Sequence, residues 1–357
     1  MKVAFITRST LYTAPGGDTV QIVETARELT GMGITVDILL SNEVILYEQY
    51  DVLHFFNITR PADILGHSKK AKKTFVVSTI LCNYSEYDKH HRKGMGVLFT
   101  YLSGDGVEYI KTIARWVLGK DHLVSIDYLW KGQRKCIVEI LRRAAIILPN
   151  SESEYSRVQQ TYLSKVKYLV VPNGVNPTLF NRNPAIKKDE RLILCVARIE
   201  GIKNHLNLIK ALNNTPYRLL IIGSHSPNQA AYYNQCRNLA NDNISFIDHL
   251  PQNELVAYYQ RAKVHILPSW FETTGLSSVE AAVMGCNVVI TDKGDTREYF
   301  GDAAFYCDPI NPQSILAAVE KASLAPSNEI LSEKILKQYT WKQAALQTLK
   351  AYQLVTS

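Results

Sequence analysis

The sequence has few cysteines, and none is placed to form a local pair. Its 357 residues contain six, with no C-x-x-C spacing, at Cys82, Cys136, Cys195, Cys236, Cys286 and Cys307. In a chain of this length, scattered cysteines predict buried free thiols in a reducing compartment. They exclude a small fold that depends on a disulfide framework.

Long hydrophobic runs are also absent. No stretch approaches the roughly 18 apolar residues of a membrane-spanning helix, and residues 1–8 contain too short an apolar run for a signal peptide. We therefore expect a cytoplasmic protein. Hydrophobic residues make up 46% and charged residues 20%, which excludes disorder, collagen and coiled coil as descriptions of the whole chain.

Charge of one sign is only in small excess. The chain has 40 Lys and Arg against 33 Asp and Glu, a net charge of +7. Residues 1–172 hold 22 basic and 17 acidic residues (+5), and residues 173–357 hold 18 and 16 (+2). This excess is too sparse for a dedicated nucleic-acid binder. It favours anionic small molecules or an anionic membrane surface.

Short apolar runs rich in β-branched residues recur along the chain. They lie at 3–6, 36–40, 52–56, 75–79, 145–148, 168–171, 192–196, 219–222, 244–247, 264–267, 288–291 and 303–306. The runs are continuous rather than alternating, which is typical of strands buried on both faces. Helical patterns such as 21–29 and 204–212 separate most of them. Alternating strands and helices predict parallel sheets with right-handed crossovers.

Two such sets predict an α/β fold of two doubly wound, Rossmann-like domains facing across a cleft. A Pro- and Gly-rich turn at 170–177 marks the boundary. We place one domain at 1–172 and a second at 173–340. A terminal helix at 341–357 is expected to pack back on the first domain.

A helical stripe formed by Ile110, Ile113, Ala114, Val117 and Leu118 lies in the long interval 80–144, which has no strand signal. It has two interpretations, a core-facing helix with one solvated side or an interfacial helix near a lipid acceptor.

Ligands of open α/β sheets bind beyond the carboxyl ends of the strands, and two loops there are basic or glycine-rich. Gly16 and Gly17 follow the first strand, where they form either an anion site at a helix start or a tight loop that needs positive φ. Arg198 and Lys203 precede a helix with Asn204 as its candidate N-cap. They are either two cations for a diphosphate or two solvated surface charges.

A third loop, at 268–285, carries two carboxylates beside a helix start. Backbone N–H groups at Thr274, Gly275 and Leu276 would form an anion site there. The alternative for Glu280 is a capping box with Ser277, and the alternative for Glu272 is a solvated loop carboxylate. A carboxylate beside an anion site is costly unless it binds a group such as sugar hydroxyls.

These motifs resemble those of the retaining GT-B glycosyltransferases of family 4, the glycosyl transferases group 1, of the bacterial polysaccharide-assembly type. The resemblance covers nearly the whole chain. It implies that 1–172 is the acceptor-side domain and that 173–340 is the nucleotide-sugar-binding domain. It rests on five ordered motifs: Gly16-Gly17, the turn at 172–175, the R-x4-K pair Arg198 and Lys203, the E-x7-E pair Glu272 and Glu280, and the segment 294–302.

The resemblance implies a role for each matching position. Glu272 would contact hydroxyls of the donor sugar, and Glu280 the ribose of the nucleotide. Arg198 and Lys203 would neutralise the leaving diphosphate. Other positions are implied at the donor: the N–H groups of Gly16, Gly17, Thr274, Gly275 and Leu276 at the diphosphate, and Gly223, His249 and Leu250 around the base. No protein nucleophile is expected, and because there is no D-x-D pair, neither a metal nor another cofactor is expected.

The expected activity is therefore a retaining, metal-independent hexosyltransferase in cell-surface polysaccharide biosynthesis. Its donor would be a UDP- or GDP-linked sugar, its acceptor a glycan or polyprenyl-linked lipid, and its location the inner face of the membrane. The alternatives are a nucleotide-sugar epimerase of the same fold or a non-catalytic nucleotide-sugar-binding subunit. Ile80 stands where many members carry His, and His90 and His91 beside Asp88 suggest either a surface run or a metal or base.

Overall fold

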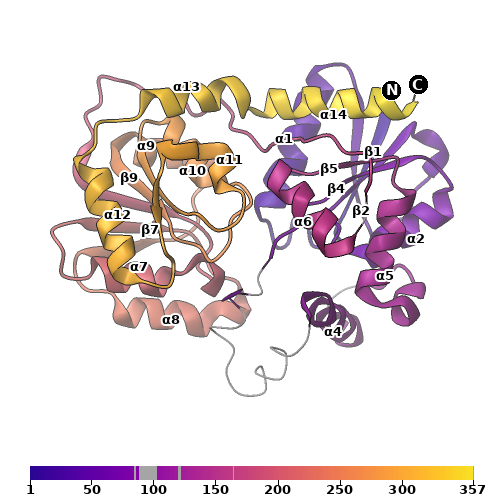
Figure 1. Ribbon diagram of the computed structural model, residues 1–357, viewed down its shortest axis with the longest axis horizontal. Coiled ribbons are helices and arrows are strands. Elements are labelled where there is room, and N and C mark those ends of the chain that lie inside the picture. Colours follow the sequence, from indigo (N-terminus) through magenta and orange to yellow (C-terminus); the bar gives the residue numbers. More distant parts are fainter. Residues whose placement is uncertain (84–85, 88–102, 120–121, 164, 357) are drawn as a thin grey trace. The chain divides into compact units, whose positions relative to one another are not determined.

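The computed structural model describes residues 1–83, 86–87, 103–119, 122–163 and 165–356. It divides into two compact units, Met1–Asn173 with Trp341–Ser357, and Gly174–Thr340 (Figure 1). Each unit is built on a sheet whose described strand pairs are all parallel. The predicted α/β class is confirmed.

The first unit has a five-stranded sheet in the order β2-β1-β3-β4-β5. Its strands are β1 (Lys2–Thr7), β2 (Thr35–Leu40), β3 (Val52–Phe56), β4 (Phe75–Ser78) and β5 (Ile146–Leu148). Its helices are α1 (Gly17–Gly31), α2 (Pro61–Ala71), α4 (Gly104–Val117), α5 (Asp127–Arg143), α6 (Glu152–Tyr162) and α14 (Trp341–Thr356), with a 3-10 turn at Tyr47–Gln49. Every residue of β3 and β4 is buried, as expected of central strands covered on both faces.

The terminal helix α14 packs against α1 in this unit. Tyr352 anchors it, because its hydroxyl is hydrogen-bonded to Nδ1 of the buried His54 on β3 at 2.6 Å. The other ring nitrogen of His54 lies 2.9 Å from Ser78 Oγ on β4. Residues nearly 300 positions apart in sequence thus share one core.

The second unit has a six-stranded sheet in the order β11-β10-β9-β6-β7-β8. Its strands are β6 (Asp189–Val196), β7 (Arg218–Ile222), β8 (Ile244–Ile247), β9 (Ala262–Leu267), β10 (Asn287–Thr291) and β11 (Phe305–Cys307). Its helices are α7 (His205–Leu212), α8 (Ala230–Leu239), α9 (Gln252–Arg261), α10 (Leu276–Val283), α11 (Thr296–Phe300), α12 (Pro312–Leu324) and α13 (Glu329–Gln338). Short 3-10 turns lie at Gly201–Lys203, Pro227–Gln229 and Gly301–Ala303.

Helices cover both faces of this second sheet. On β6, Leu194 belongs to a core cluster shared with α9 and α10. Its neighbours Ile193 and Cys195 belong to a second cluster, shared with α7 and α12. Because successive strand residues point to opposite faces, the continuous apolar run of β6 requires both layers.

One predicted strand is wrong, because 168–171 forms only an isolated bridge between Tyr168 and Ile147. The Ile147 N–H donates to Lys167 O (2.9 Å), and Ile147 O accepts from the Leu169 N–H (3.1 Å). The next donor in a parallel ladder would be residue 149, which is a proline without an N–H. The predicted run 303–306 is also displaced, because Gly301–Ala303 is a 3-10 turn and β11 begins at Phe305.

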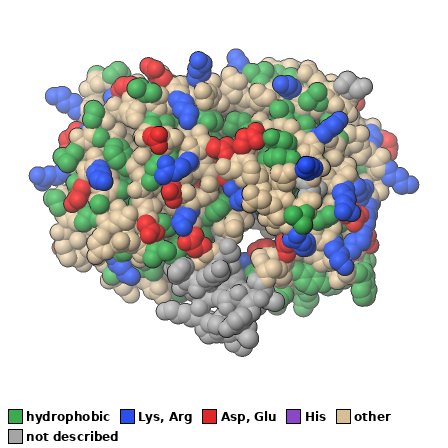
Figure 2. Space-filling model, in the orientation of Figure 1, with side chains coloured by type: hydrophobic (Ala, Val, Ile, Leu, Met, Phe, Trp, Pro, Cys, Tyr) green, Lys and Arg blue, Asp and Glu red, His purple; other side chains and the backbone are tan. Residues whose placement is uncertain are grey.

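Side chains of both charges are interspersed over most of the face shown in Figure 2. Lys and Arg gather at its right side, over the region where Figure 1 places α2 and α5. None of the described helices is long and apolar enough to cross a membrane.

Candidate functional site

The order in which the strands of the second sheet are added reverses at β6. The strands β7 and β8 extend from one side of it, and β9, β10 and β11 from the other. Because all these strands are parallel, the loops that follow β6, β7, β8 and β9 lie at one edge of the sheet. These loops and the helix α10 that follows β9 carry all the predicted residues of this unit: Arg198, Lys203, Gly223, His249, Leu250, Glu272, Thr274, Gly275, Leu276 and Glu280. A switch point of this kind is where open α/β sheets bind ligands.

Lys203 and Glu272 form an ion pair across the switch point. Lys203 Nζ lies 2.5 Å from Glu272 Oε1, and the Ser269 hydroxyl donates to the same oxygen at 2.6 Å. Glu272 is only 6% exposed, so the interpretation as a solvated loop carboxylate is wrong. The Lys203 side chain is 22% exposed, and an ammonium has three donors. It can therefore hold Glu272 and an anion together.

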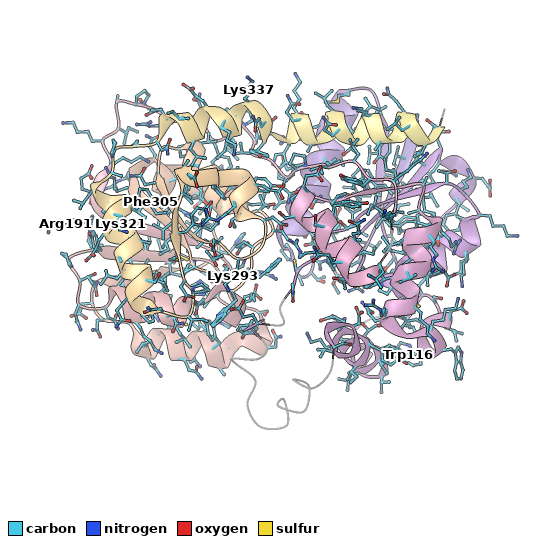
Figure 3. All side chains as sticks on the ribbon, viewed as in Figure 1. Trp116, Arg191, Lys293, Phe305, Lys321 and Lys337 are labelled. Carbon is cyan, nitrogen blue, oxygen red and sulfur yellow. The ribbon has the colours of Figure 1, made fainter. Side chains whose placement is uncertain are left out.

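The loop that carries Glu272 is held by backbone hydrogen bonds to the loop that follows β10. The Glu272 N–H donates to Lys293 O (3.2 Å), and Glu272 O accepts from the Asp295 N–H (2.9 Å). Figure 3 labels Lys293 in this unit. Gly294 between them has φ +96°, and a Cβ there would lie 2.0 Å from Glu272 O. Only glycine permits this approach.

Gly223 also permits a close approach between two backbone segments, on the other side of the switch point. Its φ is +154°, and a Cβ there would lie 2.0 Å from Ala197 O, next to Arg198. Its N–H donates to Ile247 O at 3.0 Å. Gly223 therefore lets the loops after β6 and β7 pass closely, and its amide is already occupied.

Arg198 and Asn204 differ from what the sequence suggests. The side chain of Arg198 is half-exposed and lies 2.9 Å from Glu200, so the solvated interpretation fits Arg198 better than it fits Lys203. Asn204 occupies the N-cap position of α7 in a left-handed conformation, without a side-chain cap. Its amide instead donates to Pro268 O (3.1 Å) and Pro309 O (2.7 Å), which joins three loops of the site edge.

Glu280 is not part of the alternative capping box. Helix α10 begins at Leu276 with Gly275 (φ +72°) as its N-cap, so Ser277 lies inside the helix. The Glu280 carboxylate accepts from Gln252 Nε2 (2.8 Å) and from the Tyr259 hydroxyl (3.0 Å). Burial, followed by the Glu280 charge, raises the pKa of Tyr259 well above its ordinary value. Tyr259 therefore stays a donor that orients Glu280.

The N-terminal end of α10 carries Thr274, Gly275 and Leu276. The first N–H groups of a helix have no partner within it, and they favour negative charge. The Ser278 N–H bonds to Gly275 O at 2.8 Å, so this amide is occupied within the helix.

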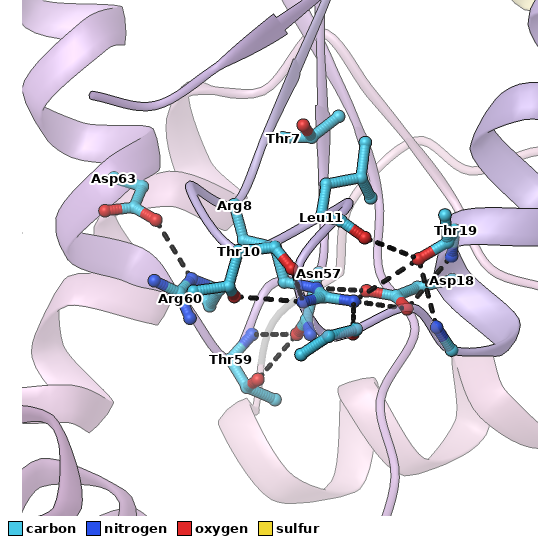
Figure 4. A network of polar contacts seen from close by, with 12 residues as sticks. Thr7, Arg8, Thr10, Leu11, Asp18, Thr19, Asn57, Thr59, Arg60 and Asp63 are labelled. Carbon is cyan, nitrogen blue, oxygen red and sulfur yellow. Dashed lines mark hydrogen bonds and ion pairs between the residues drawn. The ribbon is translucent and has the colours of Figure 1, made fainter. Parts of the chain in front are cut away.

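In the first unit, the predicted Gly16-Gly17 loop is held by Arg8, as Figure 4 shows. Arg8 Nε lies 2.7 Å from Asp18 Oδ2, and its guanidinium also donates to Thr10 O (2.7 Å) and Ala14 O (2.8 Å). Gly16 is extended (φ −151°), and the positive-φ glycines of the chain include neither Gly16 nor Gly17. The interpretation as a tight loop that needs positive φ is therefore wrong.

The Gly16 N–H donates to Thr19 Oγ1 at 3.0 Å, so this amide is occupied in the geometry shown. Sequence reasoning missed Arg8. The available signal was an arginine directly after a buried strand, with an aspartate at the start of the next helix.

Residues 178–339 match the family model of glycosyl transferases group 1. D-inositol 3-phosphate glycosyltransferase of Corynebacterium urealyticum is 25% identical over 387 residues, covering 94% of this chain and 90% of that protein. O-antigen chain mannosyltransferase B of Escherichia coli is 30% identical over 116 residues, 31% of this chain and 30% of that protein.

Two solved structures are similar over 99% of this chain. Sucrose-phosphate synthase from Thermosynechococcus elongatus has a TM-score of 0.75 at 16% identity, with 98% of that chain covered. Anabaena HepE in complex with UDP has a TM-score of 0.71 at 13% identity, with all of that chain covered. These matches support a glycosyltransferase of GT-B fold. The predicted pair of Rossmann-like domains is confirmed.

A strained backbone position lies at Ile80, where many members of the resembling family carry His. Ile80 follows β4 with φ +47°, and a β-branched residue in the left-handed region is an outlier. The buried Glu154 holds both sides of it, because its carboxylate accepts from the Thr79 hydroxyl and from the Leu81 N–H (2.7 Å). Sequence reasoning missed Glu154. His90, His91 and Asp88 lie outside the described residues.

Proposed function

We propose that the chain is a retaining, metal-independent hexosyltransferase. It transfers a sugar from a nucleotide sugar to a glycan or lipid-linked acceptor in cell-surface polysaccharide biosynthesis. The observation that carries the proposal is the partly buried ion pair of Lys203 and Glu272 at the switch point of the second sheet. UDP-linked donors are supported by the Anabaena HepE complexes with UDP and UDP-glucose.

The ion pair suits the chemistry of glycosyl transfer. As the bond from the sugar to the phosphate breaks, positive charge builds on the sugar and negative charge on the departing phosphate. Lys203 and Arg198 neutralise that phosphate, and the N–H groups at the start of α10 add fixed positive ends. Glu272 orients Lys203 and accepts hydrogen bonds from hydroxyls of the donor sugar.

Retention needs no protein nucleophile in this scheme. The acceptor hydroxyl attacks the face of the sugar that the phosphate leaves, and the leaving phosphate takes the hydroxyl proton. Two cationic side chains and a helix start supply the positive charge that a diphosphate requires, so the proposal includes no metal.

The nucleoside end of the donor lies along the loops after β7 and β8. Glu280, oriented by Gln252 and Tyr259, accepts from the ribose hydroxyls with its remaining lone pairs. Gly223, His249 and Leu250 line the base. A membrane-linked acceptor places the enzyme at the inner face of the membrane.

The test is an assay of the purified protein against UDP- and GDP-linked sugars, by donor hydrolysis and by thermal shift. Nuclear magnetic resonance of the glycosylated product gives its anomeric configuration. Inversion at the anomeric carbon would contradict retention. An epimerised nucleotide sugar formed without acceptor, or binding with no turnover, would favour an epimerase or a binding subunit instead.

A further inference from the structure

The first unit exposes a group of large apolar side chains that its core does not explain. We call it the α4–α5 tip and define it as Ile110, Trp116, Val117, Leu118, Ile126 and Trp130. Four of these are more than half exposed: Val117 (71%), Leu118 (66%), Ile126 (69%) and Trp130 (83%). Scattered exposed apolar residues are ordinary, but six within 21 positions point to an interaction surface.

The position of α4 explains which side faces outward. Val107 is buried, Ile113 packs on the core of the first unit, and the Tyr109 hydroxyl donates to Leu129 O at 2.8 Å. These contacts fix the helix, while Ile110 and Val117 of the same predicted stripe remain exposed. The stripe is therefore shared between the core and solvent.

The segment that carries the tip has a small net positive charge. Residues 103–143 contain eight Lys and Arg and five Asp and Glu, a net charge of +3. Lys111 on α4 and Lys135 on α5 are exposed, and Lys111 also pairs with Glu108 on its own helix at 2.9 Å. In Figure 2 a group of hydrophobic side chains lies at the lower right, where Figure 1 places α4, with Lys and Arg beside it. Figure 3 labels Trp116 in this region.

We propose that the α4–α5 tip docks on an anionic lipid bilayer. Exposed Trp and aliphatic side chains flanked by Lys and Arg fit the boundary between headgroups and acyl chains, where tryptophan is favoured. The basic residues attract acidic headgroups, which a second protein copy with the same charge would not supply. The biological purpose of this surface rests on the proposed membrane-linked acceptor, but vesicle binding can be measured without that acceptor.

The experiment uses the full chain and vesicles of phosphatidylcholine, with or without phosphatidylglycerol. Of the four tryptophans, Trp270 and Trp341 are each 3% exposed, so a blue shift in emission reports on Trp116 and Trp130. We expect the shift and co-sedimentation with the phosphatidylglycerol vesicles, weakened by salt. The double variant Trp116→Ser with Trp130→Ser should lower binding by about tenfold or more, and its co-sedimentation gives that number.

Val44→Ser with Leu324→Ser is the matched control, because these residues are 95% and 88% exposed and lie outside the tip. It should bind vesicles like the wild type. Lys111→Glu with Lys135→Glu should weaken binding to phosphatidylglycerol vesicles while circular dichroism stays unchanged.

Wild-type binding by the tryptophan variant, or equal binding to both vesicle types, would overturn the proposal. Self-association that the tip variant loses, without any response to vesicles, would assign the surface to a second copy instead. Vesicle binding is measured without donor or acceptor, and donor hydrolysis is measured without vesicles. A failure of the proposed activity and a failure of the membrane surface are therefore separate results.

Discussion

Lys203→Ala offers the sharpest test of the site, because the structure gives this lysine two measurable tasks. Its ammonium neutralises the leaving diphosphate in the proposed reaction, and it pairs with the buried Glu272 in the protein itself. Removing one donor that stabilises developing negative charge typically lowers kcat by about 10²–10³. We expect at least that loss in donor hydrolysis and in transfer.

The same change should also lower the free energy of unfolding. It leaves the Glu272 carboxylate, which is 6% exposed, with the Ser269 hydroxyl but without its cation. Breaking a fully buried pair costs about 3–5 kcal/mol. Because Lys203 is partly exposed and Ser269 remains bound, we expect about 2 kcal/mol, measured by urea unfolding. The double variant with Glu272→Gln should recover stability but no activity, since the buried charge is gone.

The controls separate the site from the fold. Lys210→Ala removes an exposed lysine on α7 in the same unit and should change neither measurement. Arg198→Ala should lower activity with little effect on stability, because a half-exposed surface pair contributes about 0–1 kcal/mol. Turnover of Lys203→Ala within about threefold of wild type, after correction for the folded fraction, would refute the assigned role.

Three further predictions follow from backbone and core. Gly294→Ala should lower the free energy of unfolding by about 3 kcal/mol and remove most activity, because its Cβ would lie 2.0 Å from Glu272 O. Gly104→Ala is the control in calorimetry and activity assays, because a Cβ at Gly104 would have no atom within 4 Å. Ile80→Asn should be about 1 kcal/mol more stable than Ile80→Val in urea unfolding, since Asn tolerates φ +47°; equal stabilities would contradict the strain. Burial lowers the pKa of three histidines to about 3: His54, His205 and His265. Below the ordinary histidine pKa near 6.5, the unfolded chain binds protons that the folded chain does not. The free energy of unfolding should therefore fall as the pH falls, by up to about 4 kcal/mol per pH unit. His54→Phe should lessen this slope by about a third, and a flat profile in chemical unfolding between pH 6 and 5 would refute the prediction.

The strands were predictable because short, continuous apolar runs between polar or Gly and Pro residues are typical of strands buried on both faces. Residues 52–56 and 244–247 match β3 and β8. The failure at 168–171 has a local cause that the sequence does contain. Pro149 lies on the partner segment, and it removes the donor that the second rung of the ladder needs. Apolar pattern finds a strand, but pairing depends on the hydrogen-bonding capacity of a neighbour that the pattern alone does not identify.

The same limit applies more strongly to the candidate site. Topology alone predicts that the loops carrying Lys203 and Glu272 meet at the carboxyl edge, because their strands are parallel neighbours. Sequence could not show that the two side chains pair, because pairing depends on loop conformations set by Gly294, Asn204 and their carbonyl partners. In the sequence, Gly294 stands out only as the first residue of the segment 294–302. In the structure, Gly294 allows a backbone approach that any Cβ would block. A glycine in the loop after β10 therefore helps to fix the position of a carboxylate in the loop after β9.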